Sequence, residues 1–163
     1  MGGLTRKWRG SGMGFGYDDV SRHFGRIWPV HVEQFTQLLI TLRSQFHGDL
    51  DLMLVLAVIG LRTLPGRRIQ SLSYDEFRKG ETPKHPAPIN VQSIADASGI
   101  PRETVRRKVQ QLEADGWIER QGSGYLVVSQ QAREELSPAT EASFRYLAAI
   151  GSVCIDVAGK KSP

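Results

Sequence analysis

Residues 100–120 read IPRETVRRKVQQLEADGWIER, and this stretch combines an apolar helical stripe with a cluster of cations. Apolar residues recur in it at spacings of three and four, the period of one helix face: Val105, Val109 and Leu112. At about 100° per residue, Glu103 and Arg107 fall almost opposite that face, while Thr104 and Arg106 flank it. The stretch therefore predicts a helix whose basic side faces solvent.

The preceding segment, PINVQSIADASG at residues 88–99, predicts a second and shorter helix. Asn90 is a preferred N-cap residue, and Ile89 and Ile94 occupy the two positions of a hydrophobic staple. Gly99 can take the left-handed conformation that ends a helix. Two helices joined by such a turn, the second one basic at its amino end, form the helix-turn-helix that enters the major groove of DNA.

A small hairpin is predicted directly after the second helix. Asp115 and Gly116 end that helix, and WIERQGSGYLVV at 117–128 gives two strand-like runs around a glycine-rich turn. Extended chain at 87–91 offers a third strand. The expected fold is mainly α with a small β-wing, namely a winged helix-turn-helix over 89–129 flanked by N- and C-terminal dimerisation helices.

Helical patterns lie on both sides of this segment. Pro29–Phe46 is amphipathic, Asp49–Leu64 is apolar on nearly all sides, and a closing helix begins at Ser137 and Pro138. We therefore divide the chain into a flexible basic and glycine-rich arm and a single winged-helix domain. The arm covers residues 1–28 and the domain covers 29–163. Within the domain, the N-terminal helices span 29–64, the insert 65–88, the helix-turn-helix with its wing 89–129, and the C-terminal helix 130–163.

The insert is irregular except at one point. Ser73 and Glu76 have the spacing of a capping box just before Phe77, which predicts a short helix there.

Composition limits the classes of function. The 163 residues are 40% hydrophobic and carry a net charge of +4, which fits a soluble domain and permits an anionic partner. The lone Cys154 excludes an internal disulfide, and the four histidines lack zinc-ligand spacing. The apolar run Leu50–Leu61 is far shorter than the roughly 20 residues of a membrane span. We expect a cytoplasmic protein without a metal, cofactor, membrane anchor or catalytic site.

The stretch from Asn90 to Ser129 resembles the winged helix-turn-helix of bacterial regulators of the GntR, MarR and IclR families. Its RETVRR at 102–107, followed by LEADGWIER at 112–120, is closest to the GntR pattern. The resemblance implies that Arg102, Thr104 and Arg106 contact DNA and that Gly122 to Gly124 form the tip of the wing. Helices on both sides of the motif are similar to the MarR layout, in which terminal helices pair two subunits. Pro101 departs from the Ser or Thr that is usual at this helix start.

The expected DNA-binding residues lie on the second helix and the wing. Arginine can hold guanine through two parallel hydrogen bonds, so Arg102 and Arg106 are expected to read bases. Contacts to the DNA backbone, which supply affinity rather than sequence choice, are expected from Thr104, Arg107, Arg120 and Ser123. Glu103 belongs to the same DNA-facing turn, where its negative charge interacts favourably with the positive end of the helix dipole.

Two further residues of this region receive different roles. Lys108 lies nearer the core flank and is expected to reach a phosphate or solvent. Trp117 is expected to pack in the core at the root of the wing rather than to stack on a base.

The sequence as a whole predicts a dimeric transcriptional regulator that binds double-stranded DNA sequence-specifically. The helix from Arg102 to Asp115 is expected to enter the major groove, and the terminal helices are expected to form a homodimer. The alternative is a winged-helix protein-interaction module, or a part of a replication or mobile-element complex. The sequence leaves room for a small-molecule effector but identifies no ligand.

Overall fold

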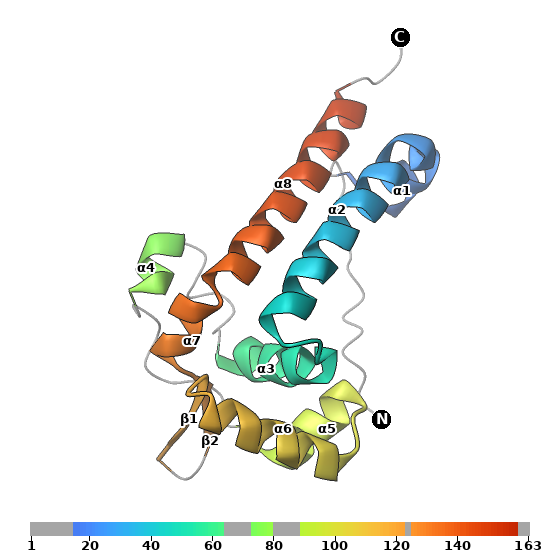
Figure 1. Ribbon diagram of the computed structural model, residues 1–163. Helices are drawn as coiled ribbons and strands as arrows, with labels where there is room; N and C mark the ends of the chain where they lie inside the picture. The colour runs from blue at the N-terminus through green and yellow to red at the C-terminus, as the bar shows by residue number, and fades with distance from the viewer. Residues whose placement is uncertain (1–14, 64–72, 80–88, 123–124, 160–163) are drawn as a thin grey trace. The chain divides into compact units, whose positions relative to one another are not determined.

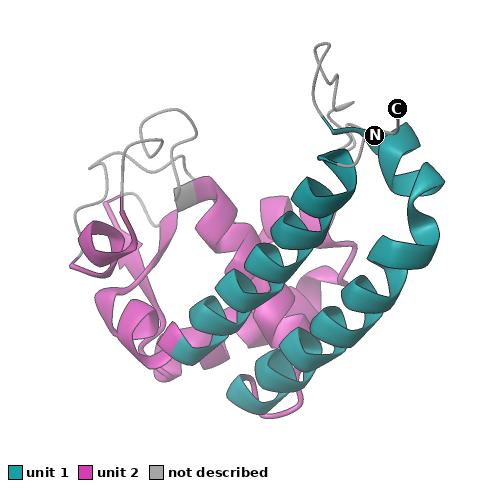
Figure 2. Cartoon of the chain, turned by 90° about the horizontal axis from the view of Figure 1, so that it is seen from above, with its two compact units in different colours: residues 1–45, 138–163 teal, residues 46–137 magenta. Residues whose placement is uncertain are grey.

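The computed structural model describes residues 15–63, 73–79, 89–122 and 125–159. The chain divides into two compact units, residues 1–45 with 138–163 (unit 1) and residues 46–137 (unit 2), coloured separately in Figure 2. The predicted fold class is confirmed, because the described residues form helices and one small antiparallel hairpin (Figure 1). The expected single domain over 29–163 differs from this division, since the terminal helices group together in unit 1.

Unit 2 is built around helix α3, which packs against α5, α6 and β2. The elements of unit 2 are α3 (Leu50–Thr63), α4 (Tyr74–Arg78), α5 (Val91–Ser98), α6 (Arg102–Ala114), β1 (Ile118–Gln121), β2 (Tyr125–Val128) and α7 (Gln130–Glu135). The largest fully buried side chains of this core come from four of these elements: Leu52, Val55, Ile59, Ile94, Val105, Val109, Leu112 and Leu126. The predicted apolar faces of the helices are therefore the faces that the fold buries.

The two helices of the motif begin and end where their local sequence predicts. Asn90 Oδ1 accepts a hydrogen bond from the Ser93 amide at 2.9 Å, and this caps α5. Gly99 ends α5 with a φ of 73°, in the left-handed region that glycine adopts without steric cost. Pro101 precedes α6 and supplies no side-chain cap, because its ring carries no hydrogen-bonding group.

The wing pairs Ile118 with Val128 and Gln121 with Tyr125. The predicted third strand is not formed within the described residues, where the sheet has two strands and Ile89 contributes a single carbonyl to the amide of Leu126 at 3.5 Å. One hydrogen bond of that length does not extend a ladder.

Trp117 lies at the root of the wing and is buried, as predicted. Its Nε1 donates to a carboxylate oxygen of Glu135 at 2.7 Å, and its ring packs in a T-shaped arrangement with that of Phe46, with 5.4 Å between centroids. The ring therefore belongs to the core of unit 2 and is not free to stack on a base.

A short helix that we did not predict, α7, follows the wing. Ser129 caps α7 by accepting the Ala132 amide at 3.0 Å, while its hydroxyl donates to the Gly116 carbonyl at 2.6 Å. The closing helix that we predicted from Ser137 and Pro138 is confirmed as α8 (Ser137–Ala158), and α7 precedes it within the predicted part 130–163, separated from it at Leu136. The predicted capping box of the insert is confirmed, because Ser73 accepts the Glu76 amide and the Glu76 carboxylate accepts the Ser73 amide.

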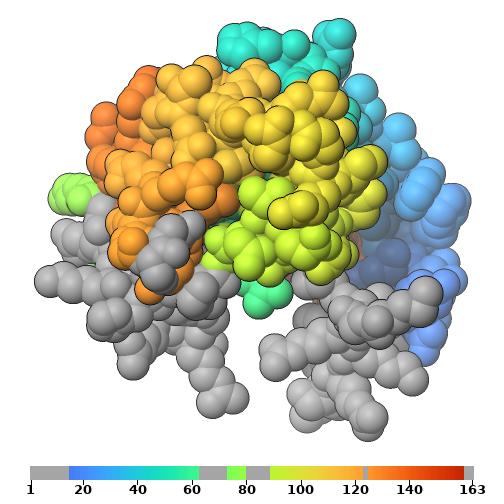
Figure 3. Space-filling view, turned by 90° about the horizontal axis from the view of Figure 1, so that it is seen from below, coloured from blue at the N-terminus to red at the C-terminus, as the bar shows by residue number. Residues whose placement is uncertain are grey.

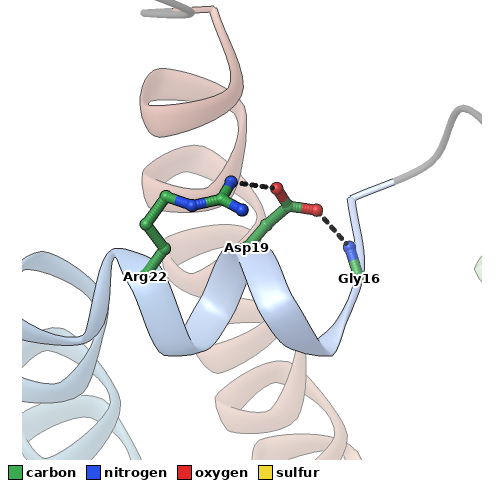
Figure 4. A network of polar contacts seen from close by, with 3 residues as sticks. All are labelled: Gly16, Asp19 and Arg22. Atoms are coloured by element: carbon green, nitrogen blue, oxygen red, sulfur yellow. Dashed lines mark hydrogen bonds and ion pairs between the residues drawn. The ribbon is translucent and has the colours of Figure 1, made fainter.

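Unit 1 contains α1 (Tyr17–Arg22), α2 (Phe24–Gln45) and the greater part of α8. We predicted a flexible arm over 1–28, but residues 17–22 and 24–28 are helical, and residues 1–14 of that arm lie outside the described residues. Asp19 holds the start of α1, because its carboxylate accepts the Gly16 amide at 3.0 Å and Arg22 Nη1 at 3.2 Å (Figure 4).

Helix α2 begins five residues before Pro29, the residue we expected at its start. Proline lacks a backbone N–H donor, but ring contacts on one helix face continue past Pro29. The ring centroids are 5.2 Å apart for Phe24 and Trp28, 5.0 Å for Trp28 and His31, and 5.4 Å for His31 and Phe35. Residues three and four apart share a helix face, so these contacts stabilise the extended amino end.

Helices α2 and α8 meet within unit 1 through polar and aromatic side chains. His31 Nδ1 and the Tyr146 hydroxyl are 3.0 Å apart and share a hydrogen bond, and the rings of Phe35 and Tyr146 lie 5.9 Å apart.

No single helix of the described residues has both the length and the apolar composition to cross a membrane; only α2 and α3 counted together reach those limits.

Candidate nucleic-acid interface

Helix α6 carries most of the residues that we predicted to bind DNA, either opposite its core face or on the flanks of that face. Val105, Val109 and Leu112 are buried, which fixes the rotation of the helix. Arg102, Glu103, Arg106 and Arg107 are exposed, and Thr104 is half-buried at the flank. In unit 2, α5, α6 and the wing lie together on one face (Figure 3). The predicted orientation of the basic side of α6 is therefore confirmed.

Arg106 and Glu103 form a bidentate ion pair on the surface of α6. The Arg106 Nε and Nη2 atoms lie 2.9 Å and 2.6 Å from the two carboxylate oxygens of Glu103. The hydrogen bond from Arg106 lowers the pKa of Glu103 below its ordinary value, and Glu103 in turn raises the pKa of Arg106. Both side chains are more than half exposed, so DNA can replace either partner with little loss of stability.

Arg120 on β1 reaches across to Glu113 on α6. Its Nε lies 2.5 Å from one oxygen of Glu113 and its Nη2 lies 3.2 Å from the other. This fork links the wing to the helix.

Lys108 lies near the core flank, as predicted, but its contact differs from the prediction. Its ammonium group forms an ion pair with Asp49, which precedes α3, and neither side chain is more than 28% exposed. The prediction of a phosphate or solvent contact for Lys108 is therefore wrong for this structure. The residue turns inward because it lies three positions after the buried Val105 and four before the buried Leu112, which places it on their side of the helix.

Arg102 and Arg107 differ from the other cations of α6. Among the residues that the structure describes, neither has a carboxylate partner. Their positive charge is therefore available to an anionic ligand without displacing another group.

Arg102 also lines a pocket of about 290 Å³ between the start of α5 and the wing. The other residues that line the pocket are Asn90, Val91, Gln92, Arg120 and Leu126. The pocket brings together two guanidinium groups that are eighteen positions apart in the sequence. Arg102 is available there to a phosphate oxygen, whereas Arg120 would have to exchange Glu113 for one.

Ser123, the remaining predicted site residue, lies outside the described residues, as does Gly124.

Asp49 and Glu113 were not predicted from the sequence, because their partners are distant along the chain and no periodicity signals them. The Glu103–Arg106 pair could be predicted from the sequence, because residues three apart on a helix share a face. Within the described residues, no group of three or more His, Cys, Asp or Glu side chains is placed to hold a metal ion.

Comparison with known families gives one match, in which residues 67–135 are similar to the Crp-like helix-turn-helix domain. The matched part contains α4 to α7 and the wing. Neither the curated proteins nor the solved structures gave a match to the chain. The chain thus carries a winged helix-turn-helix domain of a DNA-binding kind. Because the matched family is Crp-like, the GntR-like and MarR-like details of the resemblance stay predictions.

Proposed function

We propose that the protein is a bacterial transcriptional regulator that acts in the cytoplasm, binding double-stranded DNA sequence-specifically as a homodimer. The observation that carries this proposal is the outward set of arginines on α6, held in place by a fully buried apolar face. A helix of this kind, following a tight turn and followed by a wing, suits insertion into the major groove. The similarity of 67–135 to a Crp-like helix-turn-helix domain supports the same function.

Base recognition is assigned to the amino-terminal half of α6. Arg102 can approach guanine directly, whereas Arg106 must exchange its carboxylate partner for a base. Glu103, once released, can accept a hydrogen bond from the N4 amino group of cytosine. Thr104 on the flank and Arg107 on the exposed face are assigned to the DNA backbone.

The wing is assigned to the backbone as well. Arg120 shares its pocket with Arg102 and with the first residues of α5, where backbone amides without helical partners also favour an anion. Ser123 is assigned to the tip of the wing, where it can donate to a phosphate oxygen. Contacts of this type fix the register of the domain on the duplex.

The dimer is assigned to unit 1, because its helices expose many large apolar side chains. The exposed apolar residues of α2 and α8 are Phe24, Trp28, Val32, Phe35, Leu39, Ile40, Phe144, Leu147 and Ile155. Apolar surface of this kind marks an association site, and a second copy of the chain is the simplest partner. A twofold dimer would place two copies of α6 about 34 Å apart, on half-sites one turn of duplex apart.

Selection of bound sequences from a random duplex pool at fixed salt tests this function. We expect enrichment of a pseudo-palindrome whose half-sites are separated by about one helical turn. Arg102→Ala should reduce the enrichment, whereas Arg145→Ala on α8 is the matched control and should leave it unchanged. Absence of enrichment, together with no salt-sensitive binding to any duplex, would replace the proposal by the protein-interaction module.

A further inference from the structure

The ion pair between Lys108 and Asp49 joins helix α6 to the start of α3, across 59 positions of sequence. Lys108 ends a run of three cations, Arg106, Arg107 and Lys108, of which only the first two are exposed. Lys108 instead has a side-chain exposure of 21%, and that of Asp49 is 28%. Two cations of the run therefore lie on the surface, and the third lies at the edge of the core.

Asp49 uses both of its carboxylate oxygens. Oδ1 accepts the amide of Leu52 at 2.9 Å and so caps α3, while Oδ2 accepts a hydrogen bond from the ammonium group of Lys108. Leu52 is fully buried in the core of unit 2, and Val109, beside Lys108, is 1% exposed. The pair therefore connects two residues whose immediate neighbours are fixed by packing, and a rotation of α6 about its axis would separate the charges.

The carboxylate of Asp49 stays charged at neutral pH. Partial burial alone would raise the pKa of Asp49, but the hydrogen bonds from Lys108 and from the Leu52 amide outweigh it and lower that pKa. A half-buried lysine that is already paired gains less from a phosphate than an exposed one does. Lys108 is therefore poorly suited to bind DNA, even though its sequence position suggests that role.

We infer that Lys108 and Asp49 form a positioning pair, which adds to the buried stripe of α6 in holding the helix so that Arg102 and Arg107 face the duplex, and that Lys108 itself does not touch DNA. This inference rests on the proposed DNA-binding function. It assigns to Asp49 an unusual effect, namely that an acidic residue increases the affinity of the protein for a polyanion. Simple charge repulsion predicts the opposite.

Asp49→Asn in the full-length chain separates the two explanations, because asparagine keeps the cap on α3 and removes the charge. If Asp49 positions α6, affinity for the preferred duplex should fall roughly five- to tenfold and affinity for a scrambled duplex should fall less. If Lys108 binds phosphate, the substitution should leave affinity unchanged or raise it, and that result would overturn the inference. Asp51→Asn, with the same change of charge in the first turn of α3, is the control and should not weaken binding.

Lys108→Gln and Lys108→Arg supply an independent readout that does not depend on Asp49. If Lys108 binds a phosphate, Lys108→Gln should reduce the slope of log K against log salt by about 0.9, whereas a purely positioning role predicts an unchanged slope. Arginine keeps the pair and should restore binding to the preferred duplex. Variants are compared at a temperature at which their circular dichroism shows them to be folded.

Failure of the inference and failure of the proposed function are distinguishable in these measurements. A wild-type chain that binds no duplex contradicts the proposed function. A wild-type chain that binds, with an Asp49→Asn variant that binds equally well or better, contradicts only the positioning role.

Discussion

The two units of the molecule differ in where they keep their apolar side chains. In unit 2, four elements contribute large, fully buried residues to one core, among them Leu52, Ile94, Leu112 and Leu126. In unit 1, the described helices bury mainly small residues and few large ones: Ile27, Ala139, Ala142 and Val157. Most of the exposed large apolar residues of the described chain belong to unit 1 instead.

This difference indicates that the two units are stabilised in different ways. Unit 2 removes its apolar surface from water within one chain, as an independently stable domain does. Unit 1 also has apolar helical sequence but leaves much of it on helix surfaces, which is typical of elements that complete their core in an assembly. The proposed DNA-binding surface accordingly lies on the unit that has its own core, and association is assigned to the other.

The largest effect is expected from a cavity in unit 2. Leu112→Ala removes a fully buried side chain from the core face of α6 and should lower the free energy of unfolding by about 2–5 kcal/mol. Leu147→Ala, at a position that is 60% exposed in unit 1, should change the unfolding of the isolated chain much less. Denaturant unfolding at low protein concentration measures both. Equal decreases at the two positions would remove the distinction between the units.

The next effect concerns the apolar surface of unit 1. Leu39→Glu and Leu147→Glu should convert a dimer to a monomer, because each places a charge in a surface from which association would remove water. Leu61→Glu introduces the same substitution at an exposed leucine of unit 2 and should leave the mass unchanged. Sedimentation of the three variants and the wild type provides the masses. A monomeric wild type would contradict the assignment of the dimer to unit 1.

A third prediction concerns roles within α6 of unit 2. Arg106→Ala should cost roughly 1–3 kcal/mol on the preferred duplex and relax its sequence choice, because alanine cannot hydrogen-bond to a base. Arg107→Ala should weaken binding to all duplexes alike, since a phosphate contact carries no sequence information. Binding to matched and mismatched duplexes at one salt concentration distinguishes the two variants. Decreases of equal size on every sequence for both variants would remove the base-reading role of Arg106.

The smallest effect is a dependence of stability on pH in unit 2. The folded state lowers the pKa of Asp49, so its charge contributes stability that is fully present above the unfolded pKa of about 3.9. That contribution disappears as the pH falls through the folded value. The stability difference between the wild type and Asp49→Asn should therefore be greatest near neutral pH and shrink in acid. A difference that grows on acidification would have the wrong sign.

Features set by neighbouring residues were predictable from the sequence. The cap at Asn90, the left-handed Gly99 and the buried stripe through Val105 depend on spacings of a few residues, and all three were confirmed. The exposed arginines of α6 follow from the same stripe, because fixing one face of a helix fixes the opposite face.

Features set by distant contacts were not predictable. Lys108 pairs with Asp49, and Arg120 pairs with Glu113. These partners are brought together by the tertiary fold, and local sequence spacing does not reveal them. The amino end of α2 was also not predicted, since Pro29 indicates a helix start while aromatic side chains on one face extend the helix before it. The start of α7 depends on the docking of Ser129 against Gly116, which is a tertiary contact.

The salt dependence of duplex binding tests the central claim, that Arg102 and Arg107 on α6 of unit 2 bind DNA. The double variant Arg102→Ala/Arg107→Ala is compared with wild type and with Arg145→Ala in unit 1, by fluorescence anisotropy over a range of salt concentrations. We expect affinity to fall at every salt, and the slope of log K against log salt to decrease by up to about 0.9 for each phosphate that the double variant no longer binds. The control should retain both the slope and the affinity of the wild type. Unchanged slope and affinity in the double variant would contradict the claim.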